Sequence, residues 1–127
     1  MAFRFYNPNP HGNIVGDCVI RATAKVLGTD WDTAYAAVSL QGFKDKDMPS
    51  SNGVWARCLD AHGFHPEIAM CQYLKPPCTV RTFADSHPTG RFLLFVGGHV
   101  VTVIDGDYYD TWDSGNLVPF FYWKEKR

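Results

Sequence analysis

Residues 91–110, RFLLFVGGHVVTVIDGDYYD, determine the fold class that the sequence predicts. Two apolar runs, at 91–96 and 100–104, are rich in the β-branched and aromatic residues that favour strands. The dipeptide Asp105-Gly106 then indicates a two-residue hairpin turn that leads into another strand at Tyr108-Tyr109. We therefore expect an antiparallel sheet in the last third of the chain.

The chain before this sheet is predicted to be mostly helical. The first expected helix runs from Cys18 to a cap at Gly28, and the second starts in the capping-box pattern of Thr29 and Asp32 and runs to Gly42. A third helix is expected from Ser51 or Asn52 to Gly63, and a short one from Thr79 to about Ser86. Two further strands are expected, a short one near Glu67–Met70 and a last one at Phe120–Trp123. Helices followed by strands are typical of the α+β class. We expect residues 1–127 to form one domain, with N-terminal helices packed on a C-terminal antiparallel sheet.

Composition and charge limit the classes of partner. The 127 residues include 12 Lys and Arg against 13 Asp and Glu, and 46% are hydrophobic. This balance is typical of a folded domain and offers no basic face for nucleic acid. The sequence has neither the apolar run of a membrane span nor, in its opening residues MAFRFYNP, the apolar core of a signal peptide. We expect a cytoplasmic protein without membrane or nucleic-acid partners, whose four cysteines stay reduced.

Cys18 and His99 are the candidate reactive pair. Cys18 lies at the first turn of the first predicted helix, where free N–H groups and the helix dipole stabilise an anion and lower a thiol pKa. His99 follows Gly97-Gly98 and begins a strand, and the glycines leave room for another element to approach its ring. A thiol nucleophile needs a base of this kind, and the base needs an acceptor on its other nitrogen.

Two acids, Asp110 and Asp113, are candidates for that acceptor. A two-residue turn at 105–106 pairs Ile104 with Asp107 and brings Asp110 within diagonal reach of His99. A turn that is longer by one residue places Asp113 opposite His99 instead. The register of this hairpin therefore decides which of the two acids accepts a hydrogen bond from His99.

The order of these residues resembles that of papain-like cysteine peptidases, in which a cysteine opens a helix, a histidine opens a strand, and Asn or Asp lies on the next strand. The matching stretches are 16–22 (GDCVIRA), 98–101 (GHVV) and 109–112 (YDTW). They are also similar to small phage and bacterial proteins that resemble bacteriocin-exporter leader peptidases. The resemblance implies a papain-like fold, a Cys18-His99-Asp110 triad, and Trp112 as the ring that shields it.

One part of the papain pattern is missing. Papain-type enzymes place a glutamine six residues before the cysteine as an oxyanion donor, and this position is Gly12 here. Asn13 is the expected substitute, together with the backbone N–H of Cys18, and Asn7 and Asn9 are further candidates.

We therefore expect a cysteine-dependent acyl-transfer enzyme without a cofactor, a peptidase or isopeptidase that acts on a peptide or protein. The same residues would serve a deamidase or a transferase equally well, and the sequence does not choose among them. A catalytically silent papain-like module that binds a peptide or partner protein is the alternative. The remaining potential zinc ligands lack the paired C-x₂-C spacing of specific zinc sites, so no metal is expected; they are Cys58, His62, His65, Cys71 and Cys78. Arg21, one turn beyond Cys18, is expected either to stabilise the thiolate or to solvate the helix.

Overall fold

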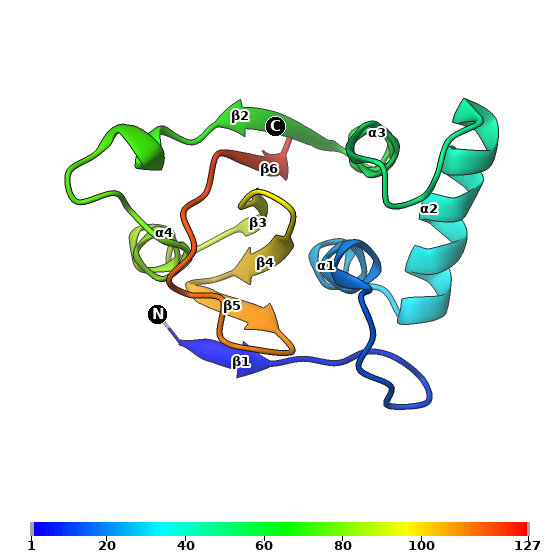
Figure 1. Cartoon of the computed structure of the whole chain (residues 1–127), viewed down its shortest axis with the longest axis horizontal. Coiled ribbons are helices and arrows are strands. Elements are labelled where there is room, and N and C mark those ends of the chain that lie inside the picture. Colours follow the sequence, from blue (N-terminus) through cyan, green and yellow to red (C-terminus); the bar gives the residue numbers. More distant parts are fainter. Residues whose placement is uncertain (1, 127) are drawn as a thin grey trace.

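A computed structural model describes residues 2–126, so the ends of the expected domain, Met1 and Arg127, lie outside the described residues. Four α-helices, a short 3₁₀ helix and six strands form an α+β architecture (Figure 1). The elements in chain order are β1 (Phe3–Phe5), α1 (Cys18–Leu27), α2 (Trp31–Asp45), α3 (Asn52–Ala61), β2 (Phe64–Ile68), η1 (Met70–Tyr73), α4 (Val80–Ser86), β3 (Arg91–Phe95), β4 (Val100–Ile104), β5 (Asp107–Asp110) and β6 (Phe121–Glu125).

The six strands form one mixed sheet in the order β1-β5-β4-β3-β6-β2. β1 runs parallel to β5, and the other neighbouring strands are antiparallel. The expectation of a purely antiparallel, C-terminal sheet is therefore wrong at both edges. β1 was missed because three residues are too few to show strand alternation, and its place depends on backbone pairing with the distant β5.

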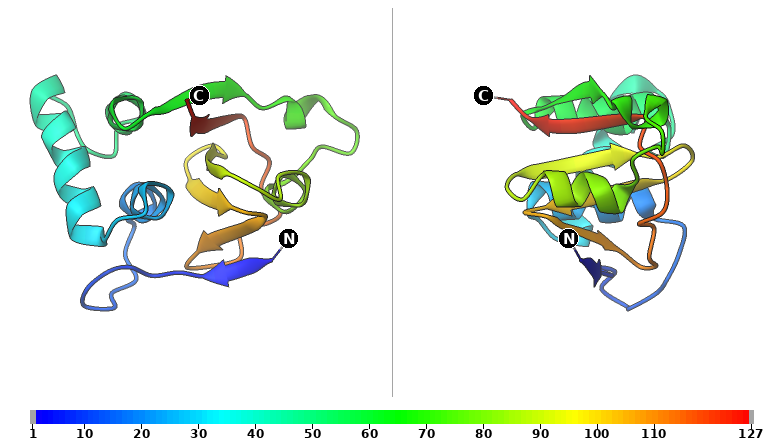
Figure 2. Two further views of the ribbon diagram at one scale, coloured as in Figure 1. Left: turned by 180° about the vertical axis from the view of Figure 1, so that it is seen from behind. Right: turned by 90° about the vertical axis from the view of Figure 1, so that its left-hand side faces the viewer.

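Helices cover both faces of the sheet rather than one. α1, α2 and α3 lie on one side, and α4 lies on the other (Figures 1 and 2). Alternate residues of β3 divide accordingly, because Leu93 packs with α1–α3 while Leu94 packs with α4. The three N-terminal helices thus lie together on one face of the sheet.

The docking of α1 on β4 determines where its N-terminus lies. The hydroxyl of Thr102, which is buried in the middle of β4, donates to the carbonyl of Ala22 at 2.7 Å. At the other end of α1, Arg91 donates to the carbonyl of Val26 at 3.3 Å. These two bonds hold the helix across the strands, so that its first residue lies beside the start of β4.

Several predicted boundaries are confirmed and others move. Gly28 caps α1 in a left-handed conformation, and Thr79 caps α4 in a capping box with Thr82. α2 is capped by Asp30 rather than by Thr29, since the Asp30 carboxylate accepts from the N–H of Thr33 at 2.7 Å. The other shifts are the end of α2 at Asp45 instead of Gly42, the end of α3 at Ala61, the strand β2 at Phe64–Ile68 instead of near Glu67–Met70, the strand β6 at Phe121–Glu125, and the unpredicted η1.

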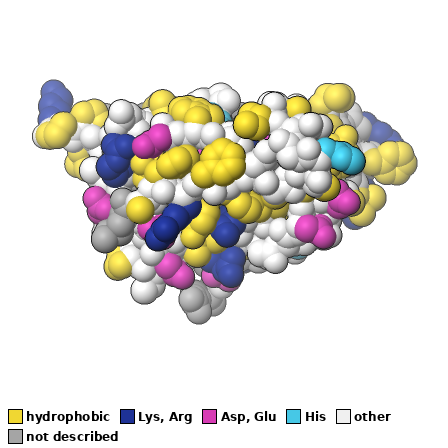
Figure 3. Space-filling model, turned by 90° about the horizontal axis from the view of Figure 1, so that it is seen from below, with side chains coloured by type: hydrophobic (Ala, Val, Ile, Leu, Met, Phe, Trp, Pro, Cys, Tyr) yellow, Lys and Arg dark blue, Asp and Glu magenta, His cyan; other side chains and the backbone are white. Residues whose placement is uncertain are grey.

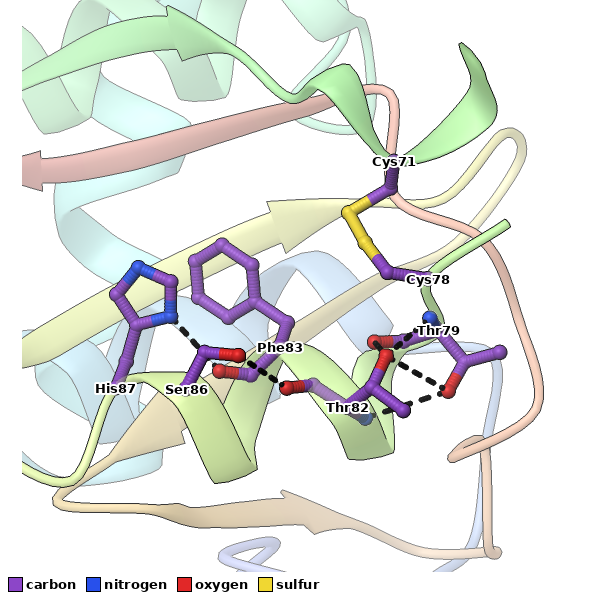
Figure 4. Close-up of a disulfide and its surroundings, with 7 residues drawn as sticks. All are labelled: Cys71, Cys78, Thr79, Thr82, Phe83, Ser86 and His87. Carbon is purple, nitrogen blue, oxygen red and sulfur yellow. Dashed lines mark hydrogen bonds between the residues drawn. A yellow bond between two sulfur atoms is a disulfide. The ribbon is translucent and has the colours of Figure 1, made fainter. Parts of the chain in front are cut away.

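Cys71 and Cys78 are joined in a disulfide, which corrects the expectation that all four thiols are free. The bond links η1 to the residue before the N-cap of α4 (Figure 4). The N–H of Cys78 also donates to the carbonyl of Cys71, so the intervening loop returns on itself. The pairing was missed because it follows from this loop closure, which cysteine spacing does not reveal.

Two further observations bear on partners. Within residues 2–126, no helix has both the length and the apolar character that a membrane crossing requires. On the face shown in Figure 3, basic and acidic side chains alternate with apolar ones instead of gathering into a basic patch.

Candidate active site

Cys18 is the first residue of α1, and its half-buried side chain lines a cavity of about 330 Å³. Asp17 is the N-cap residue, but its side chain makes no capping hydrogen bond to the helix. The first N–H groups of a helix have no partner within the helix. Because the Asp17 side chain does not cap them, these N–H donors stay free next to the sulfur. Together with the positive end of the helix dipole, they favour a thiolate.

His99 lines the same cavity as Cys18 and lies just before β4. The turn before it needs two glycines, because Gly97 and Gly98 both have positive φ, at 77° and 61°. The N–H of Val96 donates to the carbonyl of His99 at 3.0 Å and closes this turn. The His99 ring lies close enough to the Cys18 thiol to lower its pKa, so residues 81 positions apart in the chain meet as predicted.

Asp110, and not Asp113, is the acid next to His99. Ile104 pairs with Asp107 across the two-residue turn, as the shorter of the two expected turns requires. The Nε2 of His99 lies 2.7 Å from the Asp110 Oδ2, and Asp110 is 1% exposed. Asp113 instead accepts from the Tyr108 hydroxyl at 2.6 Å. With Nε2 engaged by Asp110, Nδ1 is the ring nitrogen left for Cys18.

The surroundings shift both pKa values toward an ion pair. Burial alone would raise the pKa of the Cys18 thiol, but hydrogen bonds from His99 and the Val100 backbone, with the charges of His99 and Arg21, lower it below its ordinary value. Burial alone would lower the pKa of His99, but the hydrogen bonds and charges of Asp110 and Cys18 raise it to about 9. Both shifts favour the thiolate–imidazolium form of the pair over the neutral form.

Arg21 lies inside the site rather than on the solvent side of the helix. It is 4% exposed and donates to the carboxylates of Asp17 and Asp110, the latter at 2.9 Å. Ser114, which is also buried, donates to Asp110 Oδ2 at 2.7 Å. The sequence analysis missed Asp17 and Ser114. The four-residue spacing between Asp17 and Arg21 at the start of a predicted helix was the available signal for Asp17, whereas Ser114 lies in the loop after β5 and has no such signal.

Trp112 lies where the resemblance implied. Its ring centre is 5.0 Å from that of His99, and the residue is 47% exposed. The indole therefore covers the imidazole on the solvent side.

The structure does not bring Asn13 to the cavity. Asn13 is exposed, and its carbonyl accepts from the side chain of Asn7 at 3.2 Å. Asn9 accepts from the N–H of His11 at 2.9 Å. These asparagines stabilise the loop before Cys18, so the backbone N–H groups next to the sulfur are those of the first turn of α1.

The cavity extends away from Cys18 between the helices and the sheet. A second cavity of about 350 Å³ shares Asn52, Trp55 and Phe95 with the first and continues toward β6. Trp55 and Phe95 make the shared wall largely apolar. The residues of the first cavity are Gly16, Asp17, Cys18, Val19, Ile20, Tyr35, Pro49, Ser50, Asn52, Trp55, Phe95, Gly98, His99 and Val100.

The other cysteines and histidines lie apart from this site. Residues 2–126 hold no group of three or more His, Cys, Asp or Glu side chains that is arranged to bind a metal. Cys58 lies 3.9 Å from His62, but His62 Nδ1 donates to the carbonyl of Cys58 at 2.8 Å and so cannot act as a base there. Burial also raises the pKa of Cys58. Cys18 is thus the thiol with both a base and a cavity.

Comparison with known proteins finds no match to this chain among family models, curated proteins or solved structures. The resemblance to papain-like peptidases therefore depends on the residues and geometry described above.

Proposed function

We propose that this protein is a cysteine-dependent acyl-transfer enzyme, a peptidase or isopeptidase with Cys18 as nucleophile, His99 as base and Asp110 as the acid that orients it. The observation that carries this proposal is that Cys18 and His99 line the same cavity and interact, while His99 is hydrogen bonded to Asp110 on its other side. A thiol, a base and an orienting acceptor in contact are the parts that nucleophilic acyl transfer requires.

The reaction would proceed in two stages. The Cys18 sulfur attacks the carbonyl carbon of an amide, the thiol proton having passed to His99. His99 returns this proton to the leaving amine as the C–N bond breaks, and a thioester remains on Cys18. Water, deprotonated by His99, then attacks the thioester and releases the acid and the free thiol.

The negative oxygen of the tetrahedral intermediate needs hydrogen-bond donors that are already in place. We assign this role to the backbone N–H of Cys18 and its neighbours in the first turn of α1. Asp17 leaves these groups uncapped, and Val19 and Ile20 line the same cavity as Cys18.

A papain-like fold is part of the proposal. The arrangement that supports it is a cysteine at the start of α1, a histidine at the start of β4 and an acid at the end of β5. Trp112 beside His99 matches the aromatic residue of the papain pattern. A peptide or protein is the substrate class that this resemblance and the apolar cavity favour, and the site uses no cofactor in the scheme above.

Alkylation by iodoacetamide, with mass spectrometry to locate the modified thiol, tests the nucleophile. We expect Cys18 to react fast at pH 6.5 and to lose most of this reactivity in His99→Ala, because the imidazolium stabilises the thiolate. Cys58 is the internal control and should react slowly. If Cys18 reacts no faster than a free thiol at this pH, the enzymatic proposal fails and a silent papain-like module that binds a peptide becomes the better account.

A further inference from the structure

A buried ion cluster joins the helix of the proposed nucleophile to the proposed triad acid. Arg21 donates to Asp17 through one guanidinium nitrogen and to Asp110 through another, at 2.9 Å for Asp110. The three residues are 4%, 8% and 1% exposed. Removing such charges from water is costly, and a buried ion pair is often no more stabilising than apolar residues of similar volume. The position of the cluster therefore points to function rather than to stability.

The cluster closes a ring of contacts around the site. Asp17 precedes Cys18 in the chain, Arg21 links Asp17 to Asp110, and Asp110 contacts His99. His99 in turn contacts Cys18. A displacement of Asp110 is thereby transmitted to the imidazole, and Arg21 fixes Asp110 relative to the N-terminus of α1.

Each carboxylate in the ring is held on both of its oxygens. Oδ1 of Asp110 accepts from Arg21 and from the N–H of Thr111, and Oδ2 accepts from His99 and Ser114. Oδ2 of Asp17 accepts from the indole N–H of Trp31 at 2.9 Å. Trp31 and Arg21 thus hold the Asp17 side chain away from the N–H groups that it would otherwise cap.

We propose that Arg21 is a positioning residue, which sets the contact between Cys18 and His99 by tying Asp17 and Asp110 together. This inference rests on the proposed function. Arg21 touches neither the attacking sulfur nor a substrate atom in this scheme. Its fork of donors suits two carboxylates at once, whereas the single ammonium of lysine would not hold both in the same geometry.

The charged and titratable groups around Cys18 come from several elements. α1 supplies Arg21, with Asp17 at its N-cap, and the sheet side supplies His99 and, behind it, Asp110. Tyr6, from the loop after β1, lies close enough to Arg21 for the guanidinium charge to act on it, although burial raises the pKa of its phenol. Tyr35 of α2 lines the cavity with Cys18.

The test is the pH profile of Cys18 alkylation in Arg21→Lys, which keeps the charge and changes the geometry. We expect alkylation about tenfold slower than in the wild type at pH 6.5, with the difference vanishing above pH 9, where the thiol ionises without help. When Asp110 is already replaced by Asn, Arg21→Lys should slow Cys18 alkylation by less than about twofold, because Arg21 acts through Asp110. Arg57→Lys is the matched control, since the exposed side chain of Arg57 forms an ion pair with Asp45 at 2.7 Å and lines neither cavity.

The outcomes separate this inference from the proposed function. If wild-type Cys18 reacts fast and depends on His99, but Arg21→Lys lowers only the melting temperature and leaves the pH profile unchanged, Arg21 is merely structural. If the wild type shows no His99-dependent reactivity, the proposed function itself fails. If Arg21→Lys does not fold, Asp17→Asn is the variant to test. It must also slow Cys18 alkylation at pH 6.5, and an unchanged pH profile in this variant would overturn the inference.

Discussion

The replacement Asp110→Asn isolates the charge of the proposed triad acid without changing the shape of the side chain. The pKa of His99 is raised from 6.5 to about 9. This difference corresponds to about 3 kcal/mol of net preference for the charged ring. Burial opposes the charged ring, and the hydrogen bonds and charges of Asp110 and Cys18 favour it, so loss of the Asp110 charge should remove a large part of this preference. We expect the thiolate–imidazolium pair to be at least about tenfold less favoured in the variant.

The assay is the rate constant for iodoacetamide alkylation of Cys18 at pH 6.5, where only the ion pair supplies much thiolate. It should fall by about 10- to 30-fold in Asp110→Asn. Asp113→Asn is the matched control, because Asp113 accepts from Tyr108 and lies on the same loop without touching His99. The Asp113 variant should stay within about twofold of the wild type. A folded Asp110→Asn protein that alkylates at the wild-type rate, or an equal loss in both variants, would refute the assignment of Asp110.

Two further results are expected. Alkylation of Cys18 should stay intact in Cys58→Ser, Cys71→Ser and Cys78→Ser. Loss of the disulfide in the last two should lower the unfolding free energy by roughly 2–3 kcal/mol. If one of these variants keeps its fold but loses alkylation, another thiol is the nucleophile. Burial alone would raise the pKa of Asp110, but hydrogen bonds from His99 and Ser114 lower it. Its contribution to stability is therefore complete above the unfolded-state pKa and is lost as the pH falls through the lower folded-state value. Urea unfolding between pH 5 and pH 2 should show this loss in the wild type and a smaller one in Asp110→Asn.

The parts of the fold that were predictable carry local signals. Gly28, Thr79 and Asp105-Gly106 each require a particular backbone conformation or capping bond, and all three act as predicted. The two edges of the sheet carry no such signal. β1 is ordered by its parallel pairing with β5, which lies about a hundred residues away in the chain. The face on which α4 packs is likewise a property of the assembled sheet.

The proximity of Cys18 to His99 was predictable for a physical reason. A cysteine at a helix start and a histidine after two glycines each have a local rationale, and the hairpin register then selects Asp110 over Asp113. Arg21 shows the limit of this reasoning, because its direction depends on the packing of α1 against β4 and β5. The oxyanion donor was assigned from a spacing rule, and the loop that holds Asn13 follows its own hydrogen bonds instead.

The protonation of His99, followed by ¹⁵N NMR of the labelled imidazole from pH 5 to pH 10, tests the Cys18–His99 ion pair most directly. We expect the ring to stay charged up to about pH 9, and its pKa to fall toward the ordinary value in Cys18→Ser and further in Asp110→Asn. A His99 ring that becomes neutral near pH 6.5 in the wild type, and does so equally in both variants, would show that the three side chains do not act together.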